Sequence, residues 1–499
     1  MDSAEYRRAA KATVDEIADY HDSVASRRVI PDVKPGYLRL RLPASPPEEP
    51  EPWEAISADV QAHIMPGITH WASPRFMAFF PSGNSFPSAL AEMWSTALTG
   101  ANFNWICNPA VTELEALMLD WLALAFGLPE CFLSTGSTHG GGVIHSTASE
   151  AIVTVMAAAR DAFVAARTAH LSDAHAKEEH HWLLRSRLVA LGSSGTHSST
   201  KKAAQILGVR YLDIPVDAAT GFALTGPALA ATLADLAARG LEPFFLTATM
   251  GTTDVCAVDD FAAIATVLAP RRSSPSKLWV HVDAAYAGSA LLLPKHKPTA
   301  ALFSAFDSVN VNPHKWLLVN NDCSTLWLRS RHPLVSAMSV SAPYLVNSFS
   351  DASVMPDYRD WQIPLGRRFR ALKLWFVLRS FGLRRLRAHI QHGIDLATRF
   401  EASLCQRPDV FRVVTRAAFG LVCFCLVRPS LIEANDATRR LYDEVNAQGA
   451  FFLTSTLLND EFVVRVQTGV AAVQEEHIDA LFAVLLDTAT RLLPPLSQE

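Results

Sequence analysis

Lys315 lies in the run Asn310–Leu318, among Asn, His and Trp side chains. The apolar segments on either side, Phe306–Val309 and Cys323–Leu328, are predicted to be buried strands, and the run between them a loop. A lysine amine has a reference pKa of about 10.4 and is protonated in water, but burial among apolar groups lowers that pKa. A neutral amine can form a Schiff base with a carbonyl compound. By itself, Lys315 is explained more simply as a solvated surface lysine.

An aspartate stands about thirty residues upstream, where a second apolar segment ends. Trp279–Val282 is predicted to be a strand, and Asp283 follows at its carboxyl end. Ligands of open α/β sheets bind at that end. Ala284 and Ala285 leave room for a flat ring, and the carboxylate suits the protonated ring nitrogen of pyridoxal phosphate (PLP), whose chemistry needs a lysine and an acidic partner. Alone, Asp283 could equally cap the next turn.

A third feature is the segment Gly136–Glu150, which is rich in glycine, serine and threonine and precedes the alanine-rich Ala151–Ala166. The alanine-rich part is predicted to be a helix. Small residues and hydroxyls at a helix N-terminus can bind a phosphate through backbone N–H groups. The alternative is a flexible loop in which Ser146 or Ser149 caps the helix. Because the glycine patterns of nucleotide-binding proteins are missing, a nucleotide-binding module is disfavoured.

The composition supports a framework large enough to bury such a site. The chain has 499 residues, 49% hydrophobic and 19% charged, which indicates a globular protein of two or three domains. The net charge of −5 and the absence of a basic tract exclude a nucleic-acid-binding protein. Seven cysteines without a C-x-x-C pair indicate a reducing compartment. With no apolar leader and no membrane-spanning run, we expect a cytoplasmic enzyme without a metal site.

The two ends of the chain differ from its middle. Apolar residues of Tyr6–Tyr20 at helical spacing, the proline-rich linker Ala44–Pro52 and a second predicted helix, Trp53–Met65, make a segment too small to bury its own core. We therefore expect residues 1–85 to pack against another subunit as a dimerisation segment. Alternating helices and strands predict a large α/β domain over 86–390, with a mostly parallel sheet. A small α/β domain is predicted over 391–499, with strands Phe411–Val414, Leu421–Val427, Phe451–Leu453 and Phe462–Val466.

The three features together resemble the aromatic-L-amino-acid decarboxylase family, the group II PLP-dependent decarboxylases. The resemblance extends from about Tyr6 to about Leu493 and is closest in Pro66–Trp71, His281–Gly288, Asn312–Val319 and Asp357–Phe369. It implies the fold of type I PLP-dependent transferases. It also implies a homodimer with its active site at the subunit interface, and decarboxylation of aromatic L-amino acids.

The resemblance also implies roles for single residues. Gly195–Ser199 resembles a family motif whose histidine stacks on the cofactor ring, although a histidine in such a turn is usually just solvated. Pro343–Leu345, in a long segment without periodicity, resembles the catalytic loop with its tyrosine. The implied catalytic residues are Lys315, Tyr344, His197 and Asp283, and the implied cofactor-binding residues are Ala148, Ser149, His197, Thr249, Asp283, Ala285, Asn312, His314 and Lys315.

The implied substrate pocket is aromatic and apolar. Ala101 and Phe103 match residues delivered from the neighbouring subunit. Phe79 and Asn321 depart from animal members, which have Tyr and Phe there. The implied pocket residues are Trp71, Phe79, Phe80, Pro81, Ser82, Ala101, Phe103, Asn321, Leu365 and Gly366.

The substrate and the reaction type are left open. Gly366 matches a position where glycine goes with indoles and catechols and serine with phenols or histidine, which favours tryptophan; Phe, Tyr, DOPA and 5-hydroxytryptophan are the alternatives. No Arg or Lys marks a site for a side-chain carboxylate. Some similar proteins produce an aldehyde with oxygen, and those carry Phe at the loop tyrosine or Asn at the stacking histidine. With Tyr344 and His197 in place, simple decarboxylation is favoured, and an inactive scaffold of the same fold is a remaining alternative.

Overall fold

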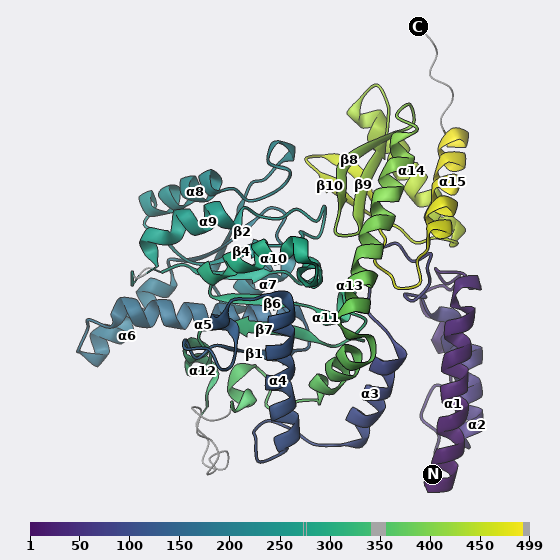
Figure 1. Cartoon of the computed structure of the whole chain (residues 1–499), viewed down its shortest axis with the longest axis horizontal. Coiled ribbons are helices and arrows are strands. Elements are labelled where there is room, and N and C mark those ends of the chain that lie inside the picture. Colours follow the sequence, from purple (N-terminus) through teal and green to yellow (C-terminus); the bar gives the residue numbers. More distant parts are fainter. Residues whose placement is uncertain (273, 276, 341–355, 493–499) are drawn as a thin grey trace. The chain divides into compact units, whose positions relative to one another are not determined.

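The computed structural model describes residues 1–272, 274–275, 277–340 and 356–492 (Figure 1). The chain forms two compact units, one of Met1–Pro81 with Gly393–Glu499 and the other of Ser82–His392. Each unit has its own sheet. Within the described ranges, no helix is both long enough and apolar enough to cross a membrane.

The larger unit is built on a seven-stranded sheet in the order β1-β7-β6-β5-β4-β2-β3. Neighbouring strands are parallel, except that β7 runs antiparallel to both β1 and β6. The strands β5 and β6 are buried along their whole length, as expected for a sheet covered on both faces. The predicted mostly parallel sheet is confirmed. The strands are β1 (Gly141–His145), β2 (Leu188–Ser193), β3 (Arg210–Ile214), β4 (Glu242–Thr249), β5 (Trp279–Asp283), β6 (Ser308–Val311) and β7 (Ser324–Leu328).

Helix α5 (Ala148–Thr168) lies across one face of this sheet and contacts β1, β4, β5, β6 and β7. Its alanine-rich sequence favours a helix, and the Thr147 hydroxyl caps it by accepting a hydrogen bond from Glu150 N–H at 3.2 Å. The other helices of this unit are α3 (Phe86–Ala97), α4 (Pro109–Phe126), α6 (Ala174–Arg185), α7 (Ser198–Leu207), α8 (Gly226–Ala238), α9 (Phe261–Leu268), α10 (Lys297–Leu302), α11 (Pro313–Trp316), α12 (His332–Met338) and the first part of α13 (Arg370–Cys405).

Strand direction decides where polar side chains can gather. The strands β1, β2, β4, β5 and β6 all run the same way, so their carboxyl ends lie along one edge of the sheet. The pairing aligns Thr249 with Asp283, and Asp283 with Asn310. Residues at or just after these strand ends are therefore held side by side, as the sequence predicts.

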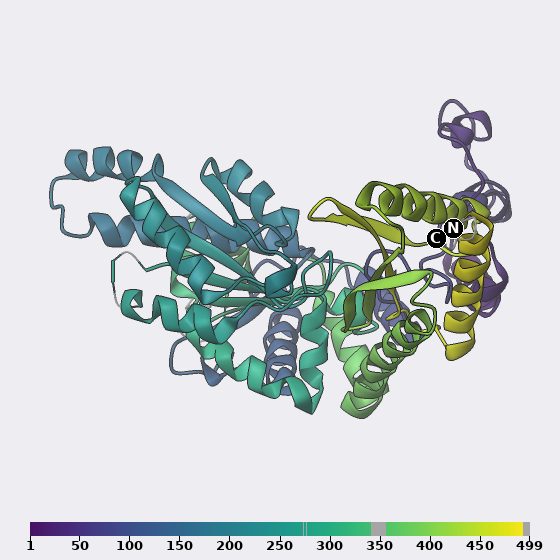
Figure 2. The same ribbon diagram turned by 90° about the horizontal axis from the view of Figure 1, so that it is seen from above.

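The smaller unit has a four-stranded antiparallel sheet in the order β10-β11-β9-β8, with helix α14 packed on β9 and β11 (Figure 2). Its elements are α1 (Ser3–Ser23), α2 (Trp53–Asp59), the end of α13, β8 (Phe411–Ala418), β9 (Leu421–Leu426), α14 (Leu431–Gln448), β10 (Thr454–Leu458), β11 (Glu461–Gln467) and α15 (Glu475–Leu492).

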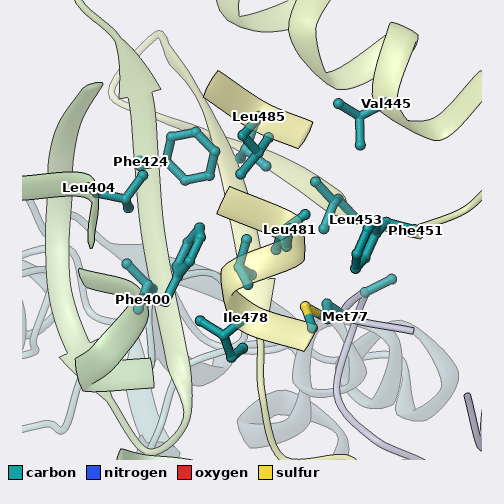
Figure 3. Close-up of a cluster of buried hydrophobic side chains, with 14 of the residues drawn as sticks. Met77, Phe400, Leu404, Phe424, Val445, Phe451, Leu453, Ile478, Leu481 and Leu485 are labelled. Carbon is teal, nitrogen blue, oxygen red and sulfur yellow. The ribbon is translucent and has the colours of Figure 1, made fainter. Parts of the chain in front are cut away.

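The core of the smaller unit joins both ends of the chain. Ile478, Leu481 and Leu485 of α15 lie on one helix face and belong to the same buried cluster as Phe424 of β9 (Figure 3). Met77, from the N-terminal segment, is fully buried in the same cluster. The N-terminal segment therefore contributes to a core whose other members come from the C-terminal part of the chain.

Two predicted strand positions are wrong by a few residues. The strand predicted at Phe306–Val309 begins two residues later, at Ser308, and the Asp307 carboxylate just before it accepts a hydrogen bond from Val280 N–H at 3.0 Å. The strand predicted at Phe451–Leu453 lies just before β10. Phe452 leaves the sheet because its N–H and C=O bond the backbone of Arg75 and Met77, at 3.1 and 3.0 Å.

We expect Leu481→Ala to lower the free energy of unfolding by about 2–5 kcal/mol, because it leaves a cavity in a buried cluster. Ile432→Ala is the matched control: Ile432 is 82% exposed on α14, and its truncation should change stability by less than about 0.5 kcal/mol. Urea unfolding of both variants measures the difference. Equal losses would contradict the packing described for α15.

Candidate functional site

Lys315 lies on a single helical turn, α11, rather than in the predicted loop. The turn begins after β6, and Lys315 N–H donates to Asn312 C=O at 2.9 Å. Trp316 is buried and stacks on Tyr286, with ring centroids 4.8 Å apart. On the other side, Gly83 N–H donates to His314 C=O at 2.6 Å. A Cβ on Gly83 would lie 2.6 Å from Val319 C=O, so only glycine allows this close approach. The turn is thus fixed from two sides.

The electrostatic surroundings of Lys315 favour a neutral amine. Burial lowers the pKa of Lys315 below its ordinary value, and the carboxylate of Asp283 and the thiol of Cys256 oppose the shift. Asp283 ends β5, as predicted, and its Oδ1 accepts a hydrogen bond from Ala285 N–H at 3.0 Å. The amine and the carboxylate therefore interact at the carboxyl edge of the sheet.

His197 belongs to the same group of side chains. It precedes α7, and its Nδ1 accepts a hydrogen bond from Ser199 N–H at 3.2 Å, which assigns the ring hydrogen to Nε2 in the neutral form. Desolvation lowers the pKa of His197, the Asp283 carboxylate acts in the opposite direction, and Lys315 adds to the decrease. Three of the four predicted catalytic residues thus influence one another in the structure. The fourth, Tyr344, lies outside the described residues.

The predicted phosphate-binding segment needs a correction. Gly141 and Gly142 are in strand β1 rather than in a loop, so the predicted phosphate site is limited here to the turn from Ser146 into α5. Thr147, not Ser146 or Ser149, is the N-cap. Ala148 and Ser149 are the first residues of the helix, where backbone N–H groups have no intrahelical acceptor. We call Ser146–Ser149 the phosphate cup.

The cup is held by Glu150. The carboxylate accepts a hydrogen bond from Ser146 N–H at 3.0 Å and lies 3.3 Å from Nδ1 of the buried His145. Burial raises the pKa of the Glu150 carboxyl, but contacts with His145 and Ser146 outweigh it and bring the value to about 2. Glu150 therefore stays charged and fixes the turn that precedes the helix.

Two further predicted phosphate ligands flank the lysine. Asn312 Oδ1 accepts a hydrogen bond from the Ser324 hydroxyl at 2.7 Å, which leaves its amide group as a donor. His314 Nδ1 accepts one from Cys323 N–H at 2.9 Å, so Nε2 carries the hydrogen. Burial, and then the charge of Lys315, lower the pKa of His314 to about 4. His314 is therefore neutral at physiological pH and presents Nε2–H as a donor.

Thr249 supplies a test of whether a cofactor fits here. Its buried hydroxyl has no hydrogen-bond partner among the described residues, which is unfavourable unless a ligand provides one. A ligand with a phosphate, an aromatic ring nitrogen and a carbonyl group would match the cup, Asp283 and Lys315 respectively. PLP has these three groups, and the residues present fit it.

The sequence did not indicate that Asp259 holds the backbone of Thr249 in place. Asp259 accepts hydrogen bonds from Thr249 N–H at 2.7 Å and from Leu224 N–H at 2.8 Å. Burial raises the pKa of Asp259 to about 7. Cys256, which influences Lys315, was missed as well. Both residues lie in an irregular segment after β4, where no periodic pattern indicates which side chains turn inward.

The predicted substrate residues of the larger unit fall into two groups. Ala101 C=O accepts a hydrogen bond from Arg367 N–H at 2.7 Å, and Phe103 C=O accepts one from Arg359 N–H at 3.0 Å. The two backbone segments therefore lie side by side. The second group lies on either side of the lysine turn: Ser82 precedes Gly83, and Asn321 follows the turn. We call Ala101, Phe103, Leu365 and Gly366 the substrate wall.

The other predicted substrate residues belong to the smaller unit. Trp71 and Phe79 are exposed and stacked, with centroids 5.7 Å apart, and Phe79 has a positive φ of 51°. Phe80 lies beneath the guanidinium of Arg465, 5.6 Å from the ring centroid, and Pro81 is buried. The assignment of these four residues to the substrate pocket stays a prediction.

Comparison with known proteins agrees with this geometry. Residues 35–427 match the family model described as the pyridoxal-dependent decarboxylase conserved domain. The chain is 40% identical over 496 residues to the aromatic-L-amino-acid decarboxylase of Cavia porcellus, covering 99% of each chain. It is 40% identical over 498 residues to the phenylacetaldehyde synthase of Arabidopsis thaliana, covering 99% of this chain and 97% of the relative. The crystal structure of Oryza sativa TDC with PLP and tryptamine is similar with a TM-score of 0.92 at 36% identity, covering 99% of each chain.

The match extends over nearly the full length of the chain, and it confirms the predicted fold, cofactor and enzyme class. The lysine, the carboxylate and the phosphate cup are the parts that such an enzyme needs. The chain belongs to the pyridoxal-dependent decarboxylase family, and it is a PLP-dependent carboxy-lyase of the kind that acts on aromatic amino acids.

Proposed function

We propose that this protein decarboxylates aromatic L-amino acids, with L-tryptophan as the preferred substrate and tryptamine and CO2 as the products. The observation that carries the proposal is the Lys315 amine, whose pKa is lowered by burial and which interacts with the Asp283 carboxylate. A relative of similar structure is solved with PLP and tryptamine, which supports this substrate class. The cytoplasmic location expected from the sequence remains part of the proposal.

Each residue of the site has a task in this reaction. The N–H groups of the phosphate cup, with Asn312 and His314, hold the phosphate. When bound, PLP supplies an electron sink for the pair left behind as the carboxylate leaves as CO2. Asp283 would stabilise a proton on the ring nitrogen of the bound cofactor, and His197 would contact the ring. The neutral amine of Lys315 would hold the cofactor through its carbonyl group.

The choice of reaction depends on the direction of the substrate carboxylate and on the return of a proton to the substrate Cα. The side chains that bind the substrate would fix the direction of its carboxylate, and that direction would select the bond that breaks. After CO2 leaves, a proton must return to the substrate Cα. We assign that proton to the Tyr344 hydroxyl, with His197 as a relay.

The substrate preference rests on Gly366. Among the described residues, a Cβ at this position would meet only Ala101 C=O, at 4.0 Å, so the wall is open there. The absent side chain leaves volume for an indole, which is larger than a phenol. Acidic substrates such as glutamate are disfavoured, because the predicted pocket residues include no Arg or Lys that would pair with a side-chain carboxylate.

An aromatic aldehyde synthase is the second candidate, because a relative at 40% identity is a phenylacetaldehyde synthase. Such a protein would release an aldehyde and consume oxygen. Tyr344 and His197 favour the decarboxylase, since aldehyde-producing proteins differ at one of these positions. An inactive scaffold is disfavoured by the intact set of Lys315, Asp283 and His197.

We also propose a homodimer whose active sites lie at the subunit interface, with residues 1–85 as the dimerisation segment, 86–390 as the cofactor domain and 391–499 as the small domain. Apolar side chains are exposed along α1, where Tyr6 is 58% exposed, and along α3, where Trp94 is 58% exposed. Such faces mark interaction surfaces. Because Ala101 bonds Arg367, Gly366 should reach the neighbour's pocket together with Ala101 and Phe103.

Product analysis tests the reaction. Purified protein with PLP is given L-Trp, 5-hydroxy-L-Trp, L-Phe, L-Tyr, L-DOPA, L-His and L-Glu, and amine, aldehyde and peroxide are measured. We expect tryptamine without peroxide from the wild type, and aldehyde with peroxide from Tyr344→Phe, because the Cα proton donor is lost. Stoichiometric peroxide from the wild type would refute the decarboxylase, and an unchanged amine yield from Tyr344→Phe would refute the role of Tyr344.

The pH dependence of PLP binding tests the pairing of Lys315 with Asp283. The amine reacts when neutral, so the rate of PLP association should fall as the pH drops through the pKa of Lys315. Asp283 raises that pKa, so Asp283→Asn should move the midpoint to lower pH. Asp235→Asn is the control, because Asp235 is exposed and pairs with Arg239 on α8. A midpoint that rises in Asp283→Asn contradicts the assignment.

Gly366→Ser should lower the kcat/KM ratio of tryptophan over tyrosine by about tenfold or more, because the added group takes up indole volume. A heterodimer of one Lys315→Ala chain and one Gly366→Ser chain shows which subunit uses the residue. Its one lysine-bearing site should keep the wild-type ratio, since it receives Gly366 from the other chain. A ratio like that of the Gly366→Ser homodimer would show that Gly366 serves its own chain.

A further inference from the structure

A carboxylate deep in the larger unit connects two parts of the proposed machinery. Glu115 lies on α4 and is 1% exposed. Its Oε1 accepts a hydrogen bond from Ile144 N–H at 2.8 Å and forms an ion pair with the guanidinium of Arg367, which is also buried. A charge at this depth is strongly unfavourable without its partner. Removing Glu115 or Arg367 would therefore leave the other charge buried without a partner and disturb the contacts that the remaining side chain makes.

On one side, Glu115 holds the strand that leads to the phosphate cup. The strand β1 is at the edge of the seven-stranded sheet, and β7 is the one described strand that pairs with it. Ile144 N–H points away from that neighbour and would lack an acceptor without Glu115. Ile144 lies two residues before Ser146, where the cup begins. The position of the cup therefore depends on this hydrogen bond.

On the other side, Arg367 holds the substrate wall. Its backbone N–H donates to Ala101 C=O at 2.7 Å, and its C=O accepts from Asn102 Nδ2 at 3.1 Å. Its guanidinium also donates to Gln362 Oε1 and lies 4.7 Å from the centroid of the Tyr358 ring. The side chain of Arg367 is thus anchored in the core. Its backbone connects Gly366, which precedes it in the chain, to Ala101, which accepts its hydrogen bond.

We propose that Glu115 is a positioning residue for two different active sites, the cofactor cup of its own subunit and the substrate wall that this subunit presents to its neighbour. The inference rests on the proposed dimer, in which the wall serves the other chain. Glu115 itself touches neither cofactor nor substrate. Its effect on each site passes through β1 in one direction and through Arg367 in the other.

Heterodimers separate the two effects. One chain, the reporter, keeps Lys315 and performs all turnover; the other, the donor, carries Lys315→Ala and supplies the wall. We expect Glu115→Gln in the donor to change the kcat/KM ratio of tryptophan over tyrosine by about 2- to 30-fold, without changing the PLP concentration needed for half-maximal turnover. The same substitution in the reporter should raise that PLP concentration by a similar factor and leave the ratio unchanged at saturating PLP.

Glu178→Gln is the control, because Glu178 is exposed on α6 and its substitution should alter neither quantity. Where Glu115→Gln does not yield folded protein, Arg367→Lys takes its place, since lysine keeps the charge but cannot form the same forked contacts. A loss of thermal stability without either kinetic change would show a purely structural role and overturn the proposal.

The outcome also distinguishes this inference from the proposed dimer. Glu115→Gln in the reporter could change both the substrate ratio and the PLP requirement, and the Gly366→Ser heterodimer could show the mutant ratio. Together these results would mean that the wall serves its own subunit, and they would refute the proposed dimer with shared active sites. If the Gly366→Ser heterodimer keeps the wild-type ratio but Glu115→Gln in the donor has no effect, the dimer stands and the role of Glu115 is refuted.

Discussion

The site depends on the interaction between the Lys315 amine and the Asp283 carboxylate. Burial lowers the pKa of the amine, and the carboxylate raises it. Water would protonate the amine and screen the carboxylate, so the two groups must interact in a place that excludes it. The structure meets this requirement with the carboxyl edge of a sheet whose strands are covered on both faces. Asp283 ends β5, and Lys315 follows β6, its neighbour. The packing of Trp316 on Tyr286 then fixes the turn that carries the lysine.

This arrangement explains which parts of the site can be predicted from the sequence. Lys315, Asp283 and His197 each follow a short apolar run, and the rule that ligands bind at strand carboxyl ends brings them together. The phosphate cup was placed only roughly, because a strand that contains Gly141 and Gly142 looks like a loop. Glu115 and Arg367 are 252 positions apart, and no local pattern indicates that such residues meet. Asp259 lies in an irregular segment and is equally hidden.

The fold also has parts that local sequence patterns predict and parts that depend on contacts between distant residues. Alternating apolar segments predict the mostly parallel sheet, whereas the join between the N-terminal segment and the C-terminal core could not be predicted. Met77 enters that core through backbone hydrogen bonds with Phe452 and Gln467, far away in the sequence. Relatives of about 40% identity include both a decarboxylase and an aldehyde synthase. Overall similarity therefore does not decide the reaction or the substrate, and we propose that the substrate wall and Tyr344 do so in this chain.

The most direct test is to locate the lysine that binds the cofactor. Borohydride reduction of the PLP-loaded protein fixes the cofactor to the amine that holds it, and peptide mass spectrometry identifies the modified residue. The account predicts a label at Lys315, lost in Lys315→Ala, because burial makes this amine reactive. A label at another lysine, or an equal label in Lys315→Ala, would contradict it.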